Sequence, residues 1–109
     1  MDFKEYQDLS KKTAVYKDDN DKFYYLLLGL CGESGEVAEK GKKIIRDMGK
    51  NLAEEKKKEL EKELGDVLWY ISQLATELGL SLDDLAKNNL DKLFSRNSRG
   101  ALHGDGDNR

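Results

Sequence analysis

Apolar residues recur along the chain at helical spacing, and clusters of polar residues separate the recurring stretches. Residues three or four apart share one face of an α-helix, so the pattern predicts an all-helical chain. Four helices are expected. They cover Phe3–Tyr16, Lys22–Met48, a stretch that begins after Asn51 and ends near Leu78, and a last stretch that opens at the capping sequence Ser81–Asp84 and fades by Arg99.

Polar residues and glycines mark the expected ends of the two long helices. The polar cluster Lys17–Asp21 predicts a loop, in which Asn20 or Asp21 caps the second helix. Gly49 and Gly79 stand where the second and third helices are expected to stop, because glycine readily adopts the left-handed conformation that ends a helix. Proline is absent, which favours long helices.

The two long helices each carry an apolar stripe. The stripe of the third helix alternates steps of four and three residues, as in helices packed nearly parallel or antiparallel. Two such stripes form a hairpin, whose remaining apolar surface must be covered by the other helices or by a second subunit. We therefore predict an all-α, four-helix bundle-type chain that assembles into a homo-oligomer. The stripes are Leu26, Leu30, Val37 and Ile44, and Leu60, Leu64, Val67, Ile71, Leu74 and Leu78.

Length and charge narrow the class of protein. A chain of 109 residues predicts one domain, here residues 1–99, followed by a Gly- and Asp-rich tail over residues 100–109. The net charge of −3 comes from mixed charges, which argues against nucleic-acid binding. There is neither a long apolar run nor a signal-peptide pattern, and the single cysteine, Cys31, suits a reducing compartment. We expect a cytoplasmic protein with no nucleic-acid or membrane partner.

Two acidic pairs share the same spacing on the two long helices. Glu33 and Glu36 lie on one face of the second helix, and Glu63 and Asp66 lie on one face of the third. Each pair flanks its apolar stripe on the same side, so packing of the stripes can bring four carboxylates around one pocket. The alternative is that each pair belongs to a solvated helix face, since acidic pairs are common on such faces.

Crowded carboxylates repel one another, and a hard divalent cation relieves that repulsion. Mg²⁺ prefers oxygen ligands, while the lack of clustered histidine and cysteine argues against zinc and against a helical di-iron site. Gly29 and Gly32 fall beside the first acidic pair, inside a helix that each of them weakens. They leave room either for a ligand or for a closely packed neighbouring helix.

These motifs occur in a recognisable order. The sequence GLCGESGEVAEKGKK at residues 29–43, followed by EKELGDVLWYI at residues 61–71, resembles the MazG-like family of all-α nucleotide pyrophosphohydrolases, in its small phage-type and bacterial members. The resemblance extends over nearly the whole chain. It includes Tyr6-Gln7, Thr13–Tyr16, the spacing of Asn89, Lys92 and Arg96, and the ending Gly104–Arg109, in which Asp105 replaces a serine.

The resemblance implies a reaction. A nucleoside triphosphate or its deoxy form is hydrolysed between the α and β phosphates, giving the monophosphate and pyrophosphate, either to remove unwanted nucleotides (house-cleaning) or to control a nucleotide pool. Metal-activated water is the nucleophile, with Mg²⁺ as cofactor and Mn²⁺ as a substitute. The metal-binding and catalytic positions are Glu33, Glu36, Glu63 and Asp66, one of which orients or deprotonates the water. Members of the family are dimers or tetramers.

Further residues are candidates for substrate binding. Cationic and amide side chains suit phosphate and sugar, and the alternative for each is a solvated helix face or, for the last residue, a frayed terminus. Tyr70, one turn after Asp66, is a candidate for contact with sugar or base. The substrate-binding candidates are Tyr70, Asn89, Lys92, Arg96, Lys43 and Arg109. A competing hypothesis for the whole chain is a non-catalytic helical dimerisation or interaction module, which the stripe of the third helix supports.

Overall fold

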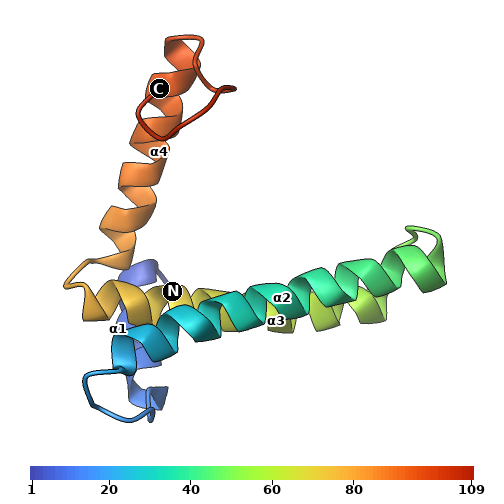
Figure 1. The fold of residues 1–109 in the computed structure, drawn as a ribbon, viewed down its shortest axis with the longest axis horizontal. Coiled ribbons are helices and arrows are strands. Elements are labelled where there is room, and N and C mark those ends of the chain that lie inside the picture. Colours follow the sequence, from blue (N-terminus) through green and yellow to red (C-terminus); the bar gives the residue numbers. More distant parts are fainter.

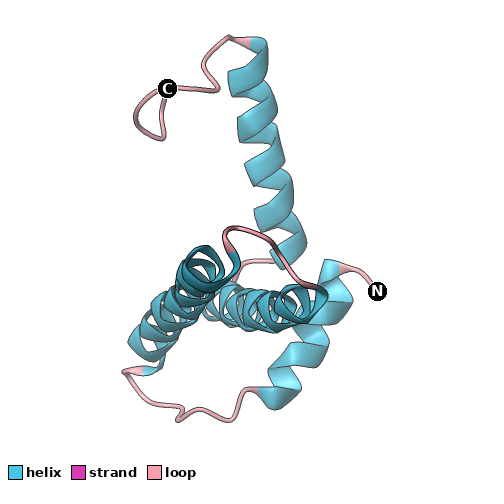
Figure 2. Ribbon diagram, turned by 90° about the vertical axis from the view of Figure 1, so that its right-hand side faces the viewer, coloured by secondary structure: helices cyan, strands magenta, loops and turns pink.

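The computed structural model of the protein describes residues 1–109 and contains helices and connecting loops, with no strand (Figure 2). The predicted all-helical class with two long central helices is confirmed. The elements in order are α1 (Phe3–Ser10), a short 3₁₀ turn η1 (Lys11–Thr13), α2 (Lys22–Met48), α3 (Glu54–Glu77) and α4 (Leu82–Ser98). None of these helices has an apolar stretch long enough to cross the hydrocarbon core of a bilayer.

Most helix ends lie at the predicted residues. Helix α2 has the predicted bounds, and Gly49 ends it in the left-handed conformation with φ of 57°. The hydroxyl of Ser81 accepts a hydrogen bond from the backbone N–H of Asp84, as a capping residue does. The tail after α4 forms the predicted loop.

Helix α1 is shorter than the sequence predicts: it ends at Ser10 and not near Tyr16. The Ser10 hydroxyl donates to the Gln7 carbonyl, and the Thr13 hydroxyl donates to the Ser10 carbonyl. Such local side-chain hydrogen bonds compete with those of the helix backbone. The chain therefore tightens into η1 and then turns toward α2.

Helices α2 and α3 form a long antiparallel hairpin, joined at its far end by a turn over residues 49–53 (Figure 1). The predicted stripes lie partly along this contact. Leu26 and Leu74 are buried, and most other stripe residues are half-buried. Leu64 and Leu78, however, are 56 % and 58 % exposed, so part of the stripe of α3 has no cover within one chain.

Helix α1 crosses the hairpin where α2 begins and α3 ends (Figure 1). Its junction with α3 is polar. The Gln7 side-chain amide donates to the Thr76 hydroxyl and to the Leu80 carbonyl, and its oxygen accepts from the Leu82 backbone N–H at 2.8 Å. Gln7 is buried, and it therefore ties α1 to both sides of the turn between α3 and α4.

Helix α4 contacts the other helices only near its start and projects away from the hairpin (Figures 1 and 2). It does not cover the hairpin, and its own Phe94 is 66 % exposed. Only nine of the 109 residues are buried. The single chain therefore has little apolar core for its length.

Candidate functional site

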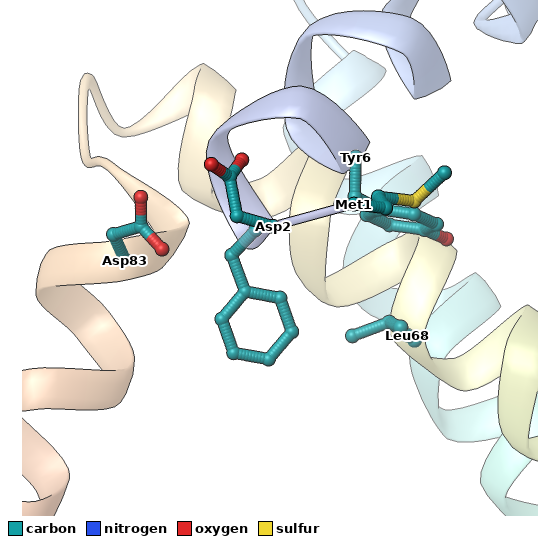
Figure 3. Close-up of a pocket in the computed structure, with 6 residues that line it drawn as sticks. Met1, Asp2, Tyr6, Leu68 and Asp83 are labelled. Atoms are coloured by element: carbon teal, nitrogen blue, oxygen red, sulfur yellow. The ribbon is translucent and has the colours of Figure 1, made fainter.

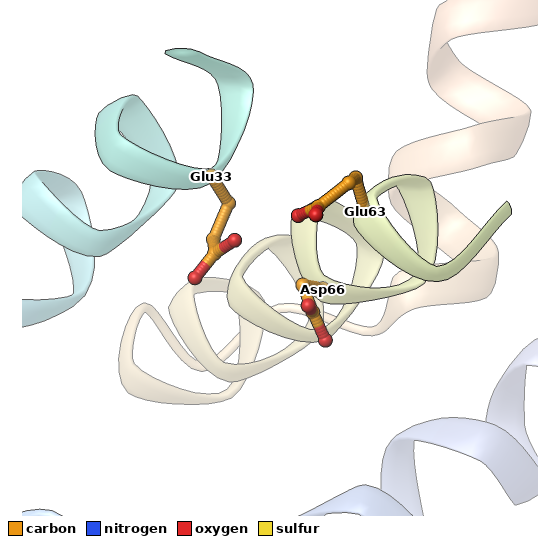
Figure 4. Close-up of side chains that lie close together, drawn as sticks. All are labelled: Glu33, Glu63 and Asp66. Carbon is orange, nitrogen blue, oxygen red and sulfur yellow. The ribbon is translucent and has the colours of Figure 1, made fainter. Parts of the chain in front are cut away.

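Three carboxylates from the two long helices converge near the middle of the hairpin. Glu33 of α2 faces Glu63 and Asp66 of α3 (Figure 4), and one oxygen from each lies within 4.8 Å of the others. Glu33 and Glu63 are half-buried, while Asp66 is exposed. We refer to Glu33, Glu63 and Asp66 as the acidic cluster.

The geometry of the hairpin explains why these side chains meet. Glu63 and Asp66 are three residues apart, so they lie on one face of α3. Gly29, one turn before Glu33, allows the two helices to approach, because a Cβ atom at position 29 would overlap the ring of Tyr70. Nothing lies within 4 Å of the corresponding position at Gly32. Gly29 therefore serves helix packing, whereas Gly32 leaves open space near the cluster.

The charges of the cluster act on one another. Partial burial, and then the charges of Asp66, Glu63 and Glu36, raise the pKa of Glu33 above its ordinary value. Glu36 is exposed and lies outside the group of three, although its charge reaches Glu33. Like charges held this close destabilise the fold unless a cation lies among them.

The donor set fits a hard divalent cation. All three groups offer carboxylate oxygen, which Mg²⁺ and Mn²⁺ accept. The single histidine, His103, belongs to the C-terminal tail, and no cysteine joins the cluster. Mg²⁺ usually takes one or two carboxylates from a protein and fills its other positions with water and phosphate oxygen, so the cluster offers enough ligands for at least one such ion.

Tyr70 is the predicted substrate-binding residue that lies at the cluster. Its ring rests against Gly29 on α2 and meets the indole of Trp69 edge-on. Burial, together with Tyr25 and the charges of Glu33 and Asp66, raises the pKa of the Tyr70 hydroxyl. Tyr70 is therefore within electrostatic reach of two of the three carboxylates.

Two residues near the cluster were not singled out as site residues from the sequence. The Nζ atom of Lys40 lies 3.6 Å from Glu63 Oε1. Tyr6 of α1 has a raised pKa because of burial and the charge of Asp66. Lys40 lies two turns after Glu33 on the same face of α2, so helical spacing alone could have placed it on the side of the acidic cluster. The sequence holds no comparable signal for Tyr6, because its place depends on how α1 crosses α3.

Tyr6 also lines an open cavity of about 460 Å³ between α1, α3 and the start of α4. The side chains of Met1, Tyr6 and Leu68 give it a largely apolar wall, with Asp83 at the far side (Figure 3). None of the three carboxylates of the acidic cluster lines this cavity, so Tyr6 is its link to the cluster only through the charge of Asp66.

Lys43 is on α2 but not at the cluster. It is exposed, and its Nζ atom lies 3.8 Å from Glu39 one turn earlier. This pair belongs to a solvated helix face, which is the alternative considered from the sequence.

The remaining predicted substrate-binding residues lie on α4 and the tail, away from the cluster of the same chain (Figure 1). Asn89 is exposed. The guanidinium of Arg96 is buried against the tail, where it contacts the carbonyl and the carboxylate of Asp107, and Lys92 Nζ lies 3.4 Å from the same carboxylate. Hydrogen bonding to Arg96 and the charge of Lys92 lower the pKa of Asp107.

Arg109 closes the tail into a loop. Its guanidinium donates to the carbonyls of Ala101, Leu102 and Gly106, and its own carbonyl accepts from Arg99. The terminus is thus held by hydrogen bonds and does not follow the default of a frayed end. One chain alone does not bring Lys92, Arg96 or Arg109 to the acidic cluster.

Comparison with known proteins agrees with this geometry. Residues 22–100, which include the whole hairpin and α4, match the MazG nucleotide pyrophosphohydrolase domain. The chain is also similar to the Gene 37 protein of Mycobacterium phage L5, with 43 % identity over 109 residues that cover 95 % of this chain and 96 % of that protein. No solved structure shows a significant similarity. The matched domain spans well over half of the sequence and both acidic pairs, and the chain therefore belongs to the MazG nucleotide pyrophosphohydrolase family.

Proposed function

We propose that this protein hydrolyses nucleoside triphosphates, ribo or deoxy, to the monophosphate and pyrophosphate. The observation that carries the proposal is the convergence of Glu33, Glu63 and Asp66 on facing helices of a chain that belongs to this family. The acidic cluster has the oxygen ligands that a metal-assisted attack on phosphorus requires.

Glu33, Glu36, Glu63 and Asp66 are the residues that would hold Mg²⁺, with Mn²⁺ as a substitute. Such a cation neutralises phosphate charge and lowers the pKa of water. Glu36 lies one turn from Glu33 on the same face, and its charge already acts on Glu33, so it is the fourth carboxylate of the proposed site.

The chain's own residues supply orientation and proton transfer. One carboxylate of the four accepts the proton of the attacking water or holds that water in line with the bond between the α and β phosphates. No covalent nucleophile is required. Tyr70 stands beside the cluster, where its ring and hydroxyl can contact the sugar or base of the substrate.

Self-association is part of the proposal, as a dimer or a tetramer. The chain exposes 8096 Å², against about 6,100 Å² for a compact monomer of its mass. Its radius of gyration is 16.8 Å, against about 13 Å for a compact domain of this length. The excess, roughly 2,000 Å², is of the size that an oligomer interface buries.

Assembly also offers a role for the cationic residues of α4. Asn89, Lys92 and Arg96 lie far from the cluster of their own chain, and Arg109 is bound up in the tail loop. In an oligomer, the projecting α4 of one copy can reach the hairpin of another. Lys92 and Arg96 would then contact the phosphates of a substrate held at that copy's cluster.

The reaction is tested by incubating the protein with each nucleoside triphosphate and Mg²⁺ and resolving pyrophosphate from orthophosphate. Pyrophosphate with monophosphate is the expected product pair. The Asp66→Asn variant should lose turnover while its thermal stability in EDTA stays equal or rises, because one repelling charge is gone. No turnover of any nucleotide at micromolar protein would leave the non-catalytic helical module as the better account, and orthophosphate as first product would place the attack at the terminal phosphate.

Assembly is tested by light scattering at micromolar concentration, where a mass of at least twice 12.4 kDa is expected. Phe94→Asp should reduce that mass, since it puts a charge on an exposed apolar site of α4. Asn88→Asp, an exposed polar site on the same helix, serves as the control. A monomer for the unmodified protein would contradict this part of the proposal without touching the chemistry.

A further inference from the structure

Lys40 lies between two carboxylates, only one of which belongs to the acidic cluster. Its Nζ atom is 3.6 Å from Glu63 Oε1 and 3.7 Å from Glu59 Oε2. The Lys40 side chain is 26 % exposed, so its ammonium is partly shielded from solvent. Within the cluster, Glu63 is the carboxylate that has a cation of the protein as a neighbour.

The arrangement follows from the two helices. Lys40 is seven residues after Glu33, which is two turns along the same face of α2. Glu59 and Glu63 are one turn apart on α3, and α3 runs antiparallel to α2. The ammonium can therefore move between an inner partner, Glu63, and an outer partner, Glu59, by rotation of its own flexible side chain.

Glu63 cannot pair fully with the Lys40 ammonium and with a divalent metal ion at the same time. An ammonium within ion-pair distance of Glu63 repels any divalent ion that takes the same carboxylate. We propose that Lys40 is a positioning residue that holds Glu63 in the metal-free protein and competes with the divalent cation for it. On metal binding the ammonium leaves Glu63 for Glu59. This inference rests on the proposed function, because it takes the acidic cluster as the metal site.

The competition has two consequences for the protein without metal. Lys40 reduces the repulsion among Glu33, Glu63 and Asp66, so it stabilises the hairpin when no metal is bound. Lys40 also lowers the affinity of the cluster for the first metal ion that binds. The same residue thus keeps the site folded and sets the metal concentration at which the site fills.

The test measures Mn²⁺ binding directly, by the loss of the free-Mn²⁺ signal in electron paramagnetic resonance. Lys40→Met should bind Mn²⁺ about tenfold more tightly than the unmodified protein, the order expected for removal of one nearby positive charge. Lys40→Arg keeps the charge and should stay near the unmodified value. Lys40→Gln is a second neutral variant in case Lys40→Met does not fold.

Lys56 provides the matched control. Its Nζ atom lies 2.9 Å from Glu59 Oε2, so it shares the outer partner of Lys40 but has no contact with Glu63. Lys56→Met removes the same charge from the same helix hairpin and should change Mn²⁺ affinity by less than about twofold. In thermal unfolding, the gain on adding Mn²⁺ to EDTA-treated protein should be larger for Lys40→Met than for Lys56→Met.

Glu59 separates competition from a general effect of charge. Glu59→Gln removes the outer partner, keeps the ammonium on Glu63 and should weaken Mn²⁺ binding. When Lys40 is already replaced by Met, Glu59→Gln should change Mn²⁺ affinity much less. If Glu59 acted on the metal only through its long-range charge, Glu59→Gln would change Mn²⁺ affinity equally in both backgrounds.

Unchanged or weaker Mn²⁺ binding in both neutral variants at position 40 would overturn the inference. If the inference about Lys40 fails in this way but the unmodified protein still binds Mn²⁺ and hydrolyses nucleotides, the proposed function is unaffected. Failure of the unmodified protein to bind Mn²⁺ at all would instead overturn the metal site of the proposed function, and the competition with it.

Discussion

The ring of Tyr70 on α3 lies so close to Gly29 on α2 that a methyl group at position 29 would overlap it. This contact sets the separation of the two helices one turn away from Glu33. Any side chain at position 29 must push Tyr70 aside or move the helices apart, and either change disturbs the acidic cluster.

Gly29→Ala should therefore destabilise the protein, by roughly 1–3 kcal/mol in urea unfolding, because overpacking outweighs the gain in helix propensity. Gly32→Ala is the matched control, since the space at Gly32 is open. It should be neutral or stabilising by up to about 1 kcal/mol. Equal effects of the two variants would show that the Tyr70 contact does not limit the approach of the helices.

Glu33 predicts how stability depends on pH when metal is removed. The pKa of Glu33 is raised in the folded protein, so the unfolded chain releases this proton at lower pH than the folded one. Stability from this group is present below the unfolded pKa and is lost as pH rises through the folded pKa. In EDTA, the Tm of the unmodified protein relative to Glu33→Gln should fall as pH rises from the ordinary pKa of a glutamate through the raised pKa of Glu33.

The control for this experiment is Glu61→Gln, an exposed site on α3 outside the cluster. Its pH profile should parallel that of the unmodified protein. Saturating Mg²⁺ should remove this loss of stability, because a bound cation favours ionised Glu33. A difference between Glu33→Gln and the unmodified protein that stays constant over the whole range would contradict the assigned shift.

Gln7 is expected to be the most sensitive polar residue of α1. Gln7→Leu leaves the buried N–H of Leu82 without its partner and removes two further hydrogen bonds. The cost should be about 2–4 kcal/mol in urea unfolding at fixed protein concentration. Asp8→Asn, which affects the exposed pair with Lys4 on the same helix, should have a much smaller effect, because solvent screens such pairs. A cost for Gln7→Leu no larger than that of Asp8→Asn would mean that this junction does not stabilise the fold.

Arg109 is expected to control local order at the C-terminus. Arg109→Ala removes three hydrogen bonds to carbonyls of the tail and should speed tryptic cleavage after Arg99 about tenfold, since cleavage tracks local opening. Global stability should change by about 0.5 kcal/mol or less. Asp105→Asn, outside these hydrogen bonds, should leave the cleavage rate unchanged. An unchanged rate in Arg109→Ala would show that the loop is held by other contacts.

The sequence was sufficient for the parts of the fold that local rules decide. The bounds of α2 follow from periodicity and from Gly49, and the start of α4 follows from Ser81. The early end of α1 was not predictable in the same way. Local hydrogen bonds of Ser10 and Thr13 end that helix, and Ser10 is also buried against Ser72 of α3, a contact 62 residues away along the chain that helical periodicity does not predict.

Part of the candidate site could also be predicted from the sequence, and part of it could not. Helical spacing predicts which carboxylates share a face, and the structure brings Glu33, Glu63 and Asp66 together; their role in binding metal stays a prediction. The separation of Lys92 and Arg96 from the cluster was not predictable, since it depends on the direction that α4 takes after the turn at Gly79. That direction is set by tertiary hydrogen bonds such as those of Gln7.

The turn at residues 49–53 marks the part of the hairpin most distant from α1 and α4 (Figure 1). It lies sixteen residues beyond Glu33 along α2, or about 24 Å. Lengthening such a turn carries a small entropic cost, about 0.6 kcal/mol for each doubling. An affinity tag or a fluorescent label inserted there would leave both termini native, and it would report on the protein without adding any group to the acidic cluster.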